Sequence, residues 1–461
     1  MTRTDSRVFR ACSLLRRAAL AAFVAFVVVT LSGLFRGSAQ SAQVSPSQAA
    51  LGERLFRDVR FSTPKGDLPA SCNTCHLFDE DPQGIRAYTD FFNRSWMSFR
   101  FEDPRRLILR NAPTLMDVAR MPRLHYDGEF ASLEDLVRGT FAGRPMGWLP
   151  GEQPQAFAQI QAVILSDKGD ESGAGSYREL FRKAYSLEVE KLTRDQVVNA
   201  VARAVADFMR TLNSRMNSPY DQFVRMNNLD TAPAQGESSQ AFAARMLAGI
   251  AELENKGALR FPKSFTAQAL AGLKIFYRTD GRNSSGNCVA CHAPPYFTDF
   301  SYHNIGMAQA EYDRVHGEGT FAALKIPAAA SAVRPSPQFR EYPNRQKPAE
   351  ADLGYWNFID LRTSPLRRPG ESDDQLLDRM IGTFKTPTLR HLDASYPYMH
   401  NGDYVPLDGA LNEIRRLSDL ARSGQVRSAD DELKKISLSE DDIAPLTAFL
   451  KTLNEELRRR Y

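Results

Sequence analysis

Cysteine is scarce in this sequence. Of the five cysteines among 461 residues, four lie in two short runs, Cys72-Asn73-Thr74-Cys75-His76 and Cys288-Val289-Ala290-Cys291-His292. The fifth, Cys12, stands near the N-terminus, so the chain has no further thiols for other pairings. A Cys-x-x-Cys pair alone can bind zinc or form a redox disulfide. A histidine directly after both pairs favours a third use, the covalent attachment of haem.

In such a run the two thiols add to the vinyl groups of a haem, and the adjacent imidazole becomes the proximal ligand of the iron. The sequence therefore predicts two c-type haems, one on each run, with His76 and His292 as the iron ligands. A four-cysteine zinc site is the alternative that the same residues leave open.

Strands and basic patches are also missing. No credible run of strands is present, so the predicted fold class is mostly α-helical. No basic patch argues for nucleic acid as a partner. Residues 1 to 40 carry six arginines and one aspartate, so the formal net charge of +4 falls to −1 without them.

The first 42 residues have the pattern of a secretory leader. Several arginines precede an apolar run from Ala18 to Leu34, and small residues follow it from Gly37 to Ala42. This predicts a signal peptide over residues 1 to 42 with cleavage near residue 40, and an uncleaved membrane anchor is the less favoured alternative. Bacteria attach haem through thioethers outside the cytoplasmic membrane, so both signals predict the periplasm.

A helix, a loop and a haem motif occur twice. Residues 50 to 56 have helical spacing before the first motif, and residues 266 to 277 repeat the pattern before the second. Three further helices, each opened by a capping box, are expected to begin after Ser132, Thr193 and Ser439. We therefore expect two related lobes.

Two long stretches lack clear periodicity. Residues 214 to 262 are polar apart from a possible helix over Gln240 to Glu254, and residues 311 to 369 contain seven prolines and Trp356. The predicted architecture is mostly α, with two cytochrome c-like haem lobes packed together and long irregular insertions. Residues 43–215 are expected to form the first lobe, 216–262 a linker or insertion, and 263–461 the second lobe.

Four further segments stand in a fixed order around the haem motifs: Arg110 to Leu115, Tyr126-Asp127-Gly128, Phe297 to Gly306, and Phe384 to Gly402. With the motifs, they make most of residues 47 to 455 resemble the bacterial di-haem cytochrome c peroxidase family. That family includes the MauG branch, whose members oxidise side chains of a partner protein.

By this resemblance the second haem receives electrons and the first meets peroxide, with a calcium ion between them. The family's calcium ligands, one Asn side chain and two backbone carbonyls, fall here on Asn111, Ser395 and Pro397, and such hard oxygen donors suit calcium. A Trp usually lies between the haems, and this chain has Tyr126 there. A phenol must lose its proton when oxidised, so Tyr126 either relays an electron hole with altered energetics or is a packed tyrosine.

The first haem site departs from the family's typical peroxidases. Those place a His on the open face soon after the motif, but Leu77 to Arg94 contain none, so this haem is expected to start accessible, as in MauG. The family's proton-moving Glu falls at Met146, or at Pro145 with a one-residue slip, and neither is an acid. Arg144 and Glu152 are the candidates to replace it.

Two further positions differ from the family. Its proline near the first iron falls at Thr140, beside Phe141, which either resembles the apolar cap of the di-haem rubber oxygenases or is an ordinary core phenylalanine. At the second haem the usual sixth ligand, Met or Tyr, falls at Ile414, which cannot ligate. This iron is expected to be five-coordinate unless another residue serves, and the candidates are Met399, Met307 and His391.

The function predicted from these residues is a periplasmic di-haem oxidoreductase. Peroxide would be reduced at the first haem, with electrons arriving through the second haem and Tyr126. Their source would be a small donor protein, such as a c-type cytochrome or a cupredoxin, or a side chain of a partner protein. The alternatives are a haem dioxygenase with Phe141 as an apolar cap and a non-catalytic electron carrier or sensor.

Overall fold

The computed structural model describes residues 44–80, 86–90, 100, 102–103, 110–169, 173 and 175–455. The signal peptide and the cleavage site predicted near residue 40 lie outside these residues. Within the described ranges, no helix combines the length and the apolar character that crossing a membrane requires. The fold is mostly α-helical, as predicted.

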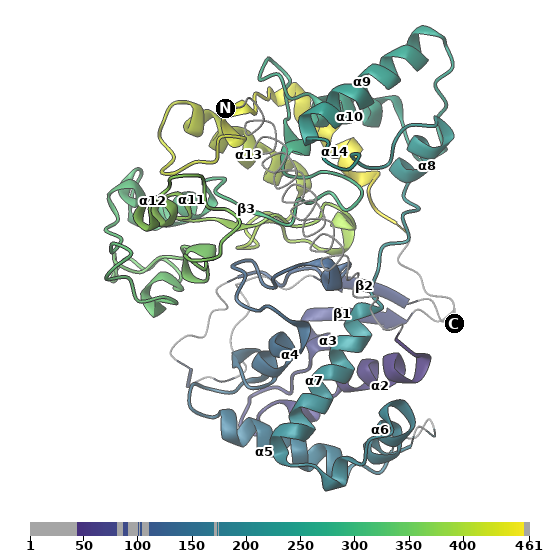
Figure 1. Cartoon of the computed structure of the whole chain (residues 1–461), viewed down its shortest axis with the longest axis vertical. Coiled ribbons are helices and arrows are strands. Elements are labelled where there is room, and N and C mark those ends of the chain that lie inside the picture. The colour runs from purple at the N-terminus through teal and green to yellow at the C-terminus, as the bar shows by residue number, and fades with distance from the viewer. Residues whose placement is uncertain are drawn as a thin grey trace, which may run out of the picture. The chain divides into compact units, whose positions relative to one another are not determined.

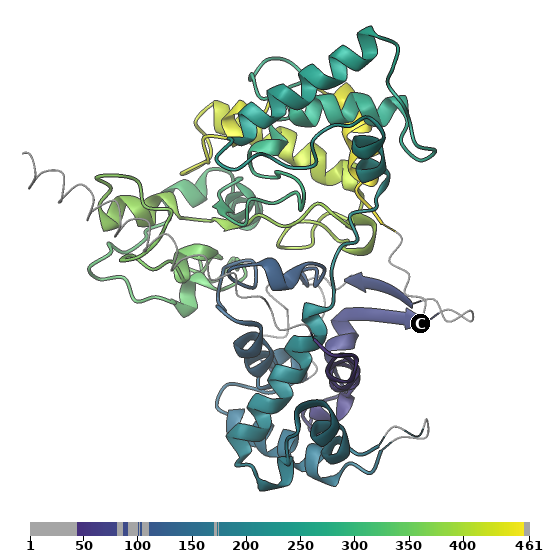
Figure 2. The same ribbon diagram turned by 45° about the vertical axis from the view of Figure 1, so that its right-hand side comes forward.

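The first lobe is built around its last helix, α7. Both α4 and α5 pack on α7, and the two views show them side by side (Figures 1 and 2). The predicted capping box of Thr193 and Gln196 opens α7, and buried residues recur along it at helical spacing. The helices of this lobe are α2 (Pro46–Arg57), α3 (Cys72–Cys75), α4 (Leu133–Phe141), α5 (Gln153–Ser166), α6 (Tyr177–Tyr185) and α7 (Arg194–Arg210).

The second lobe is built around the pair α10 and α14, which lie alongside each other (Figure 1). Its helices are α8 (Pro219–Met226), α9 (Ser239–Asn255), α10 (Ala267–Tyr277), α13 (Leu407–Arg422) and α14 (Ile443–Lys451). The segment 216–262, expected as a linker or insertion with a possible helix over Gln240 to Glu254, contributes α8 and α9 to this lobe, and Phe223, Phe242 and Ile250 are fully buried in its core. A helix of eight residues such as α8 carries too short a periodic signal to be recognised in the sequence.

The two lobes repeat one helix crossing, which supports their predicted relationship. In the first lobe α2 crosses α7 at Gly52, where an added Cβ would lie 2.0 Å from the carbonyl oxygen of Ala204. In the second lobe α10 crosses α14 at Gly272, where an added Cβ would lie 1.9 Å from the carbonyl oxygen of Pro445. A glycine is therefore required at both crossings, because any side chain would separate the helices.

An aromatic pair accompanies each crossing. Phe56 of α2 lies against Phe208 of α7, with 5.3 Å between the ring centroids, and Phe276 of α10 lies against Phe449 of α14 at 5.1 Å. The crossing glycine precedes the first phenylalanine by four residues in both lobes, so the pairs occupy equivalent places.

Gly52→Ala and Gly272→Ala are each expected to destabilise the protein by about 1 to 3 kcal/mol or more, because overpacking at a backbone contact forces the helices apart. Chemical denaturation of the haem-loaded protein measures the effect. Gly409→Ala is the matched control, since its added Cβ would meet nothing closer than 3.8 Å and alanine favours a helix. Equal stability of all three variants would contradict the proposed role of the glycines.

Two short sheets occur among the described residues, where the sequence predicted none. β1 (His76–Glu80) pairs antiparallel with β2 (Arg86–Asp90), and β3 (Tyr302–His303) pairs antiparallel with β4 (Phe384–Lys385). The strands of the β3–β4 sheet have only two residues each, so they carry no alternation that a sequence pattern could reveal. The N–H of Lys385 in β4 also donates to the carbonyl oxygen of Tyr126 over 2.8 Å, which attaches the Tyr126 segment to this sheet.

The irregular stretch 311–369 is ordered around its own apolar core. We call this the insertion cluster, and it is completed by residues of α11 (Met307–His316) and α12 (Asp373–Arg379). Trp356 is fully buried in it, and Tyr126 packs against it from the first half of the chain. The stretch therefore covers the Tyr126 region rather than forming a free loop.

Candidate functional site

Each Cys-x-x-Cys-His run folds into a single turn. In α3 the N–H of His76 donates to the carbonyl oxygen of Cys72. In the second run, which contains the 3-10 turn η5 (Cys288–Ala290), the N–H of His292 donates to the carbonyl oxygen of Cys288 over 2.8 Å. None of the four cysteines of the two runs takes part in a disulfide. Residues three and four apart on a turn share one face, so the thiols and the imidazole are presented together, as attachment of one haem requires.

A largely apolar cavity adjoins the second run. It is lined by Cys288, Cys291 and His292, with Phe276, Ile414 and Leu450 among its apolar walls. Burial lowers the pKa of His292, so its ring is neutral at pH 7. Its Nδ1 is 2.9 Å from the carbonyl oxygen of Phe297, which makes Nδ1 the donor and leaves the lone pair of Nε2 for a metal. The residues fit a covalently attached haem.

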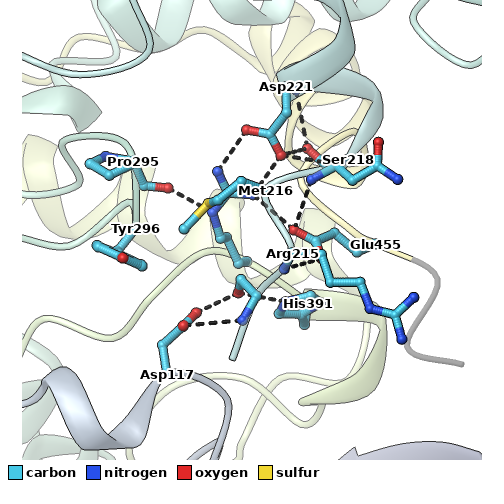
Figure 3. A network of polar contacts seen from close by, with 12 residues as sticks. Asp117, Arg215, Met216, Ser218, Asp221, Pro295, Tyr296, His391 and Glu455 are labelled. Atoms are coloured by element: carbon cyan, nitrogen blue, oxygen red, sulfur yellow. Dashed lines mark hydrogen bonds and ion pairs between the residues drawn. The ribbon is translucent and has the colours of Figure 1, made fainter. Parts of the chain in front are cut away.

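The segment from Phe384 to Gly402 holds the loop that orients His292. The hydroxyl of Thr388 donates to the carbonyl oxygen of Tyr296 over 2.6 Å, and Nε of Arg390 donates to that of Pro295 over 2.6 Å. Figure 3 shows Pro295 and Tyr296 beside this network. Both anchors lie directly before Phe297, so they fix the carbonyl that the proximal imidazole contacts.

Arg390 also joins this loop to α8. Its side chain is fully buried and forms a two-point ion pair with Asp221, at 2.8 and 2.9 Å, with Glu455 at 3.5 Å (Figure 3). Burial acts to raise the pKa of Asp221, but the hydrogen bonds and charge of Arg390 outweigh it and hold that pKa below its ordinary value. The carboxylate therefore stays ionised.

His391 is excluded as the sixth ligand of the second haem. Its Nε2 lies 2.8 Å from the hydroxyl of Ser214, whose N–H donates to Asp117 over 3.1 Å (Figure 3). It is not among the residues that line the cavity. Burial, together with the charge of Arg390, lowers the pKa of His391 to about 3, so the ring is a neutral polar contact between the lobes.

The other positions considered for the sixth ligand do line the cavity. Ile414, Met307 and Met399 all contribute to its walls. Ile414 lies on α13, two turns into the helix, and offers the cavity only carbon atoms. The two thioethers therefore remain the candidates if a protein ligand occupies the sixth position.

At the first motif, the position of Phe141 fits the core interpretation. The side chain is 1% exposed and packs edge-on against Phe61, with 5.2 Å between the ring centroids. His76 instead lies near Phe56, with 6.4 Å between the rings. Phe56 is the counterpart of Phe276, which lines the second cavity together with His292.

Both candidates for the missing acid are held in ion pairs. Nε of Arg144 lies 2.9 Å from the carboxylate of Asp103, which is completely buried. Glu152 accepts from Arg100 over 2.9 Å and from the N–H of Leu149 over 2.8 Å. Asp103 was missed in the sequence because nothing in its local pattern relates it to Arg144.

The region around Tyr126 is fixed by charge. Tyr126 lines the second cavity. Nη1 of Arg110 lies 2.6 Å from the buried carboxylate of the adjacent Asp127, and the same guanidinium makes a two-point contact, at 2.6 and 2.7 Å, with Asp352 of the insertion cluster. Asp352 lies 242 residues beyond Arg110, so no local pattern indicates this pair.

The structure brings two of the three predicted calcium ligands together. The amide nitrogen of Asn111 donates to the carbonyl oxygen of Pro397, and the N–H of Asn111 donates to that of His400 over 2.8 Å. Within the described part of the chain, the buried side-chain oxygen of Asn111 has no hydrogen-bond partner. Ser395 and Pro397 both border the second cavity. An unsatisfied amide oxygen beside a carbonyl fits a hard cation.

Known proteins are similar to this chain over most of its length. The family model of the di-haem cytochrome c peroxidases matches residues 46–228. The methylamine utilization protein MauG of Methylorubrum extorquens is 25% identical over 414 residues, covering 90% of this chain and 80% of that protein. The cytochrome-c peroxidase IdrP1 of Pseudomonas sp. strain SCT is 20% identical over 417 residues, covering 89% and 81%.

Solved structures agree at the level of the fold. A MauG-like protein associated with microbial copper homeostasis matches with a TM-score of 0.51 and 19% identity, over 89% of this chain and 90% of that one. The diheme peroxidase BthA from Burkholderia thailandensis matches with a TM-score of 0.53 and 19% identity, over 89% and 86%.

The two lobes and their haem motifs define a di-haem c-type redox protein. Over residues 46–228 the chain matches the family model of the di-haem cytochrome c peroxidases, and most of its length is similar to MauG and to cytochrome-c peroxidases. These likenesses support a peroxidase-like oxidoreductase with two haem c cofactors.

Proposed function

We propose that this protein is a periplasmic oxidoreductase that reduces peroxide at the first haem site, using electrons that enter at the second. Haem iron supplies the redox chemistry at both sites. Reduction of one peroxide to two waters consumes two electrons and two protons. The donor would be a c-type cytochrome, a cupredoxin or an oxidisable side chain of a partner protein.

The observation that carries this proposal is the placement of Tyr126. It lines the cavity of the second motif, and its carbonyl is bound to β4, which belongs to the same cavity wall. The adjacent Asp127 is held by Arg110, one residue before Asn111. An aromatic ring in a fixed backbone beside one haem site suits a relay that must keep its geometry through repeated oxidation.

The direct test mixes the protein, loaded with two haems, with peroxide and a reduced small c-type cytochrome. We expect peroxide-dependent oxidation of the cytochrome, two molecules per peroxide, followed by stopped-flow absorbance. If a c-type cytochrome, a cupredoxin and an oxidisable partner protein all failed to support turnover, the peroxidase proposal would be wrong. The non-catalytic carrier or sensor would then be favoured. Uptake of dioxygen without added reductant would favour the dioxygenase alternative, which the core position of Phe141 does not support.

Tyr126→Phe is expected to slow electron transfer between the haems by at least about tenfold, since a phenyl ring is much harder to oxidise than a phenol. Reduced protein is mixed with peroxide, and the oxidation of each haem is followed in time. Tyr312→Phe, in the insertion cluster away from the cavity, is the control. An unchanged rate in Tyr126→Phe would assign Tyr126 a packing role only.

We further propose calcium at Asn111, Ser395 and Pro397. Asn111→Ala removes the only side-chain ligand of the three and is expected to weaken calcium binding by about tenfold or more. Isothermal titration of the chelator-treated protein with calcium measures this directly. Asn344→Ala, on the surface of the insertion cluster, is the control. Equal calcium affinity in the Asn111 variant would place the ion elsewhere or remove it from the protein.

A further inference from the structure

Lys385 is a buried cation without an acidic partner. Lys385 is 8% exposed. Its ammonium donates one hydrogen bond, of 3.3 Å, to the carbonyl oxygen of Arg123. Among the residues that the structure describes, no carboxylate oxygen lies within 4.0 Å of it. An unpaired buried charge is destabilising, because the ion loses its hydration and no anion compensates it.

The other buried cations among the described residues are paired with carboxylates. Arg390 contacts Asp221 and Glu455, and Arg100 contacts Glu102 and Glu152. Each of these guanidinium groups therefore has two carboxylates. Lys385 is therefore exceptional among the described buried cations, since no described side chain serves as its counter-ion.

The place where an anion can reach Lys385 is the second cavity. Lys385 lines that cavity together with Tyr126 and the three residues of the haem motif. Its backbone is fixed on both sides, because it pairs with Tyr302 in the β3–β4 sheet and donates its N–H to Tyr126. The residue is therefore held at the part of the cavity wall that Tyr126 also forms.

Nearby charge does not neutralise Lys385. Burial lowers its pKa to about 8, and the charge of Asp127 offsets only part of that effect. The carboxylate of Asp127 is already bound by Arg110 at 2.6 Å. A haem attached at the second motif would bring two propionate carboxylates into the cavity, and Lys385 is the one lysine or arginine among the described residues that line it.

We propose that Lys385 is the cationic partner of a propionate of the second haem. This rests on the attachment of haem to Cys288 and Cys291, and it adds a second anchor at the Tyr126 side. The pair compensates both buried charges, fixes the haem edge near Tyr126, and places a positive charge close to the iron. Because a nearby positive charge favours the reduced iron, Lys385 raises the reduction potential of the second haem.

The test compares Lys385→Met and Lys385→Gln with Lys385→Arg, which keeps the charge. The matched control is Lys256→Gln, at an exposed lysine directly after α9. Potentials are measured by spectroelectrochemical titration, and the second haem is identified as the component lost in a Cys288→Ser, Cys291→Ser variant. Loss of one charge at roughly 10 Å, with an effective dielectric constant of about 20, is expected to lower the equilibrium constant for reduction about tenfold.

The expected result is a lower potential of the second haem in the Met and Gln variants, an unchanged first haem, and a nearly normal potential in the Arg variant. The propionate bending bands in the resonance Raman spectrum should shift in the same two variants. Unshifted potentials and bands with two haems attached would overturn the role of Lys385 alone. Loss of a low-spin signal in Lys385→Met would also overturn it, since it would make the amine an iron ligand. A haem count of one per chain in the unmodified protein would instead remove the second haem itself.

Discussion

Arg390→Met is expected to lower the free energy of unfolding by about 3 to 5 kcal/mol, the usual cost of removing one member of a buried ion pair. The variant leaves Asp221 and Glu455 without their cation, in surroundings where a charge is poorly solvated. It also removes the anchor of Pro295, so the carbonyl of Phe297 is no longer held against His292. Denaturant titration of the haem-loaded protein measures the stability.

A matched control separates this effect from the loss of any ion pair. Arg416→Met breaks a surface pair with Glu413 and is expected to cost no more than about 1 kcal/mol. The double variant Arg390→Met, Asp221→Leu should recover part of the lost stability, because it removes the stranded carboxylate as well. If Arg390→Met were as stable as the surface variant, the network of Figure 3 would not be holding the second lobe together.

Ile414→Met is expected to convert the second haem from a five-coordinate, high-spin iron to a low-spin iron with His and Met ligands. Ile414 lines the cavity from α13, and methionine has similar volume but carries a thioether that can ligate. Methionine ligation should also raise the reduction potential. Electron paramagnetic resonance of the oxidised protein reports the spin state of both irons, and the signal of the first haem should not change.

Leu411→Met is the control for this substitution. Leu411 lies one turn earlier on the same helix and borders the same cavity. The substitution therefore introduces the same thioether at a different place in the cavity wall. We expect it to leave the second iron high-spin. A low-spin His–Met signal already present in the unmodified protein would contradict the open site, and it would assign the sixth ligand to Met307 or Met399.

The haem motifs and the main helices followed from local patterns. The two Cys-x-x-Cys-His runs are complete within five residues each, and their chemistry depends only on spacing along one turn. The helix opened by Thr193 was predicted with its capping box because caps and apolar periodicity are short-range properties. The repeat of helix and haem motif predicted two related lobes for the same reason, and the crossings at Gly52 and Gly272 now give that repeat a structural basis.

The contacts that join distant segments could not be read in this way. The pairing of Arg110 with Asp352 joins segments 242 residues apart, and the burial of α8 and α9 in the second lobe depends on helices that follow them in the chain. His391 illustrates the difference. Its residue type made it a candidate ligand, but the fold turns it toward Ser214 and away from the cavity.

By itself, the sequence predicted the two haem attachment points and the two-lobed plan, and it determined the mostly helical fold class and the absence of an acid at the family's usual position. These depend on residue types and on spacings of a few residues. Only the tertiary structure decided which charged groups are paired, that Phe141 packs in a core, and that Lys385 stands unpaired at the wall of the second cavity. The physical reason is that ion pairing and burial depend on tertiary contacts between distant segments. Short-range sequence patterns carry no information about those contacts.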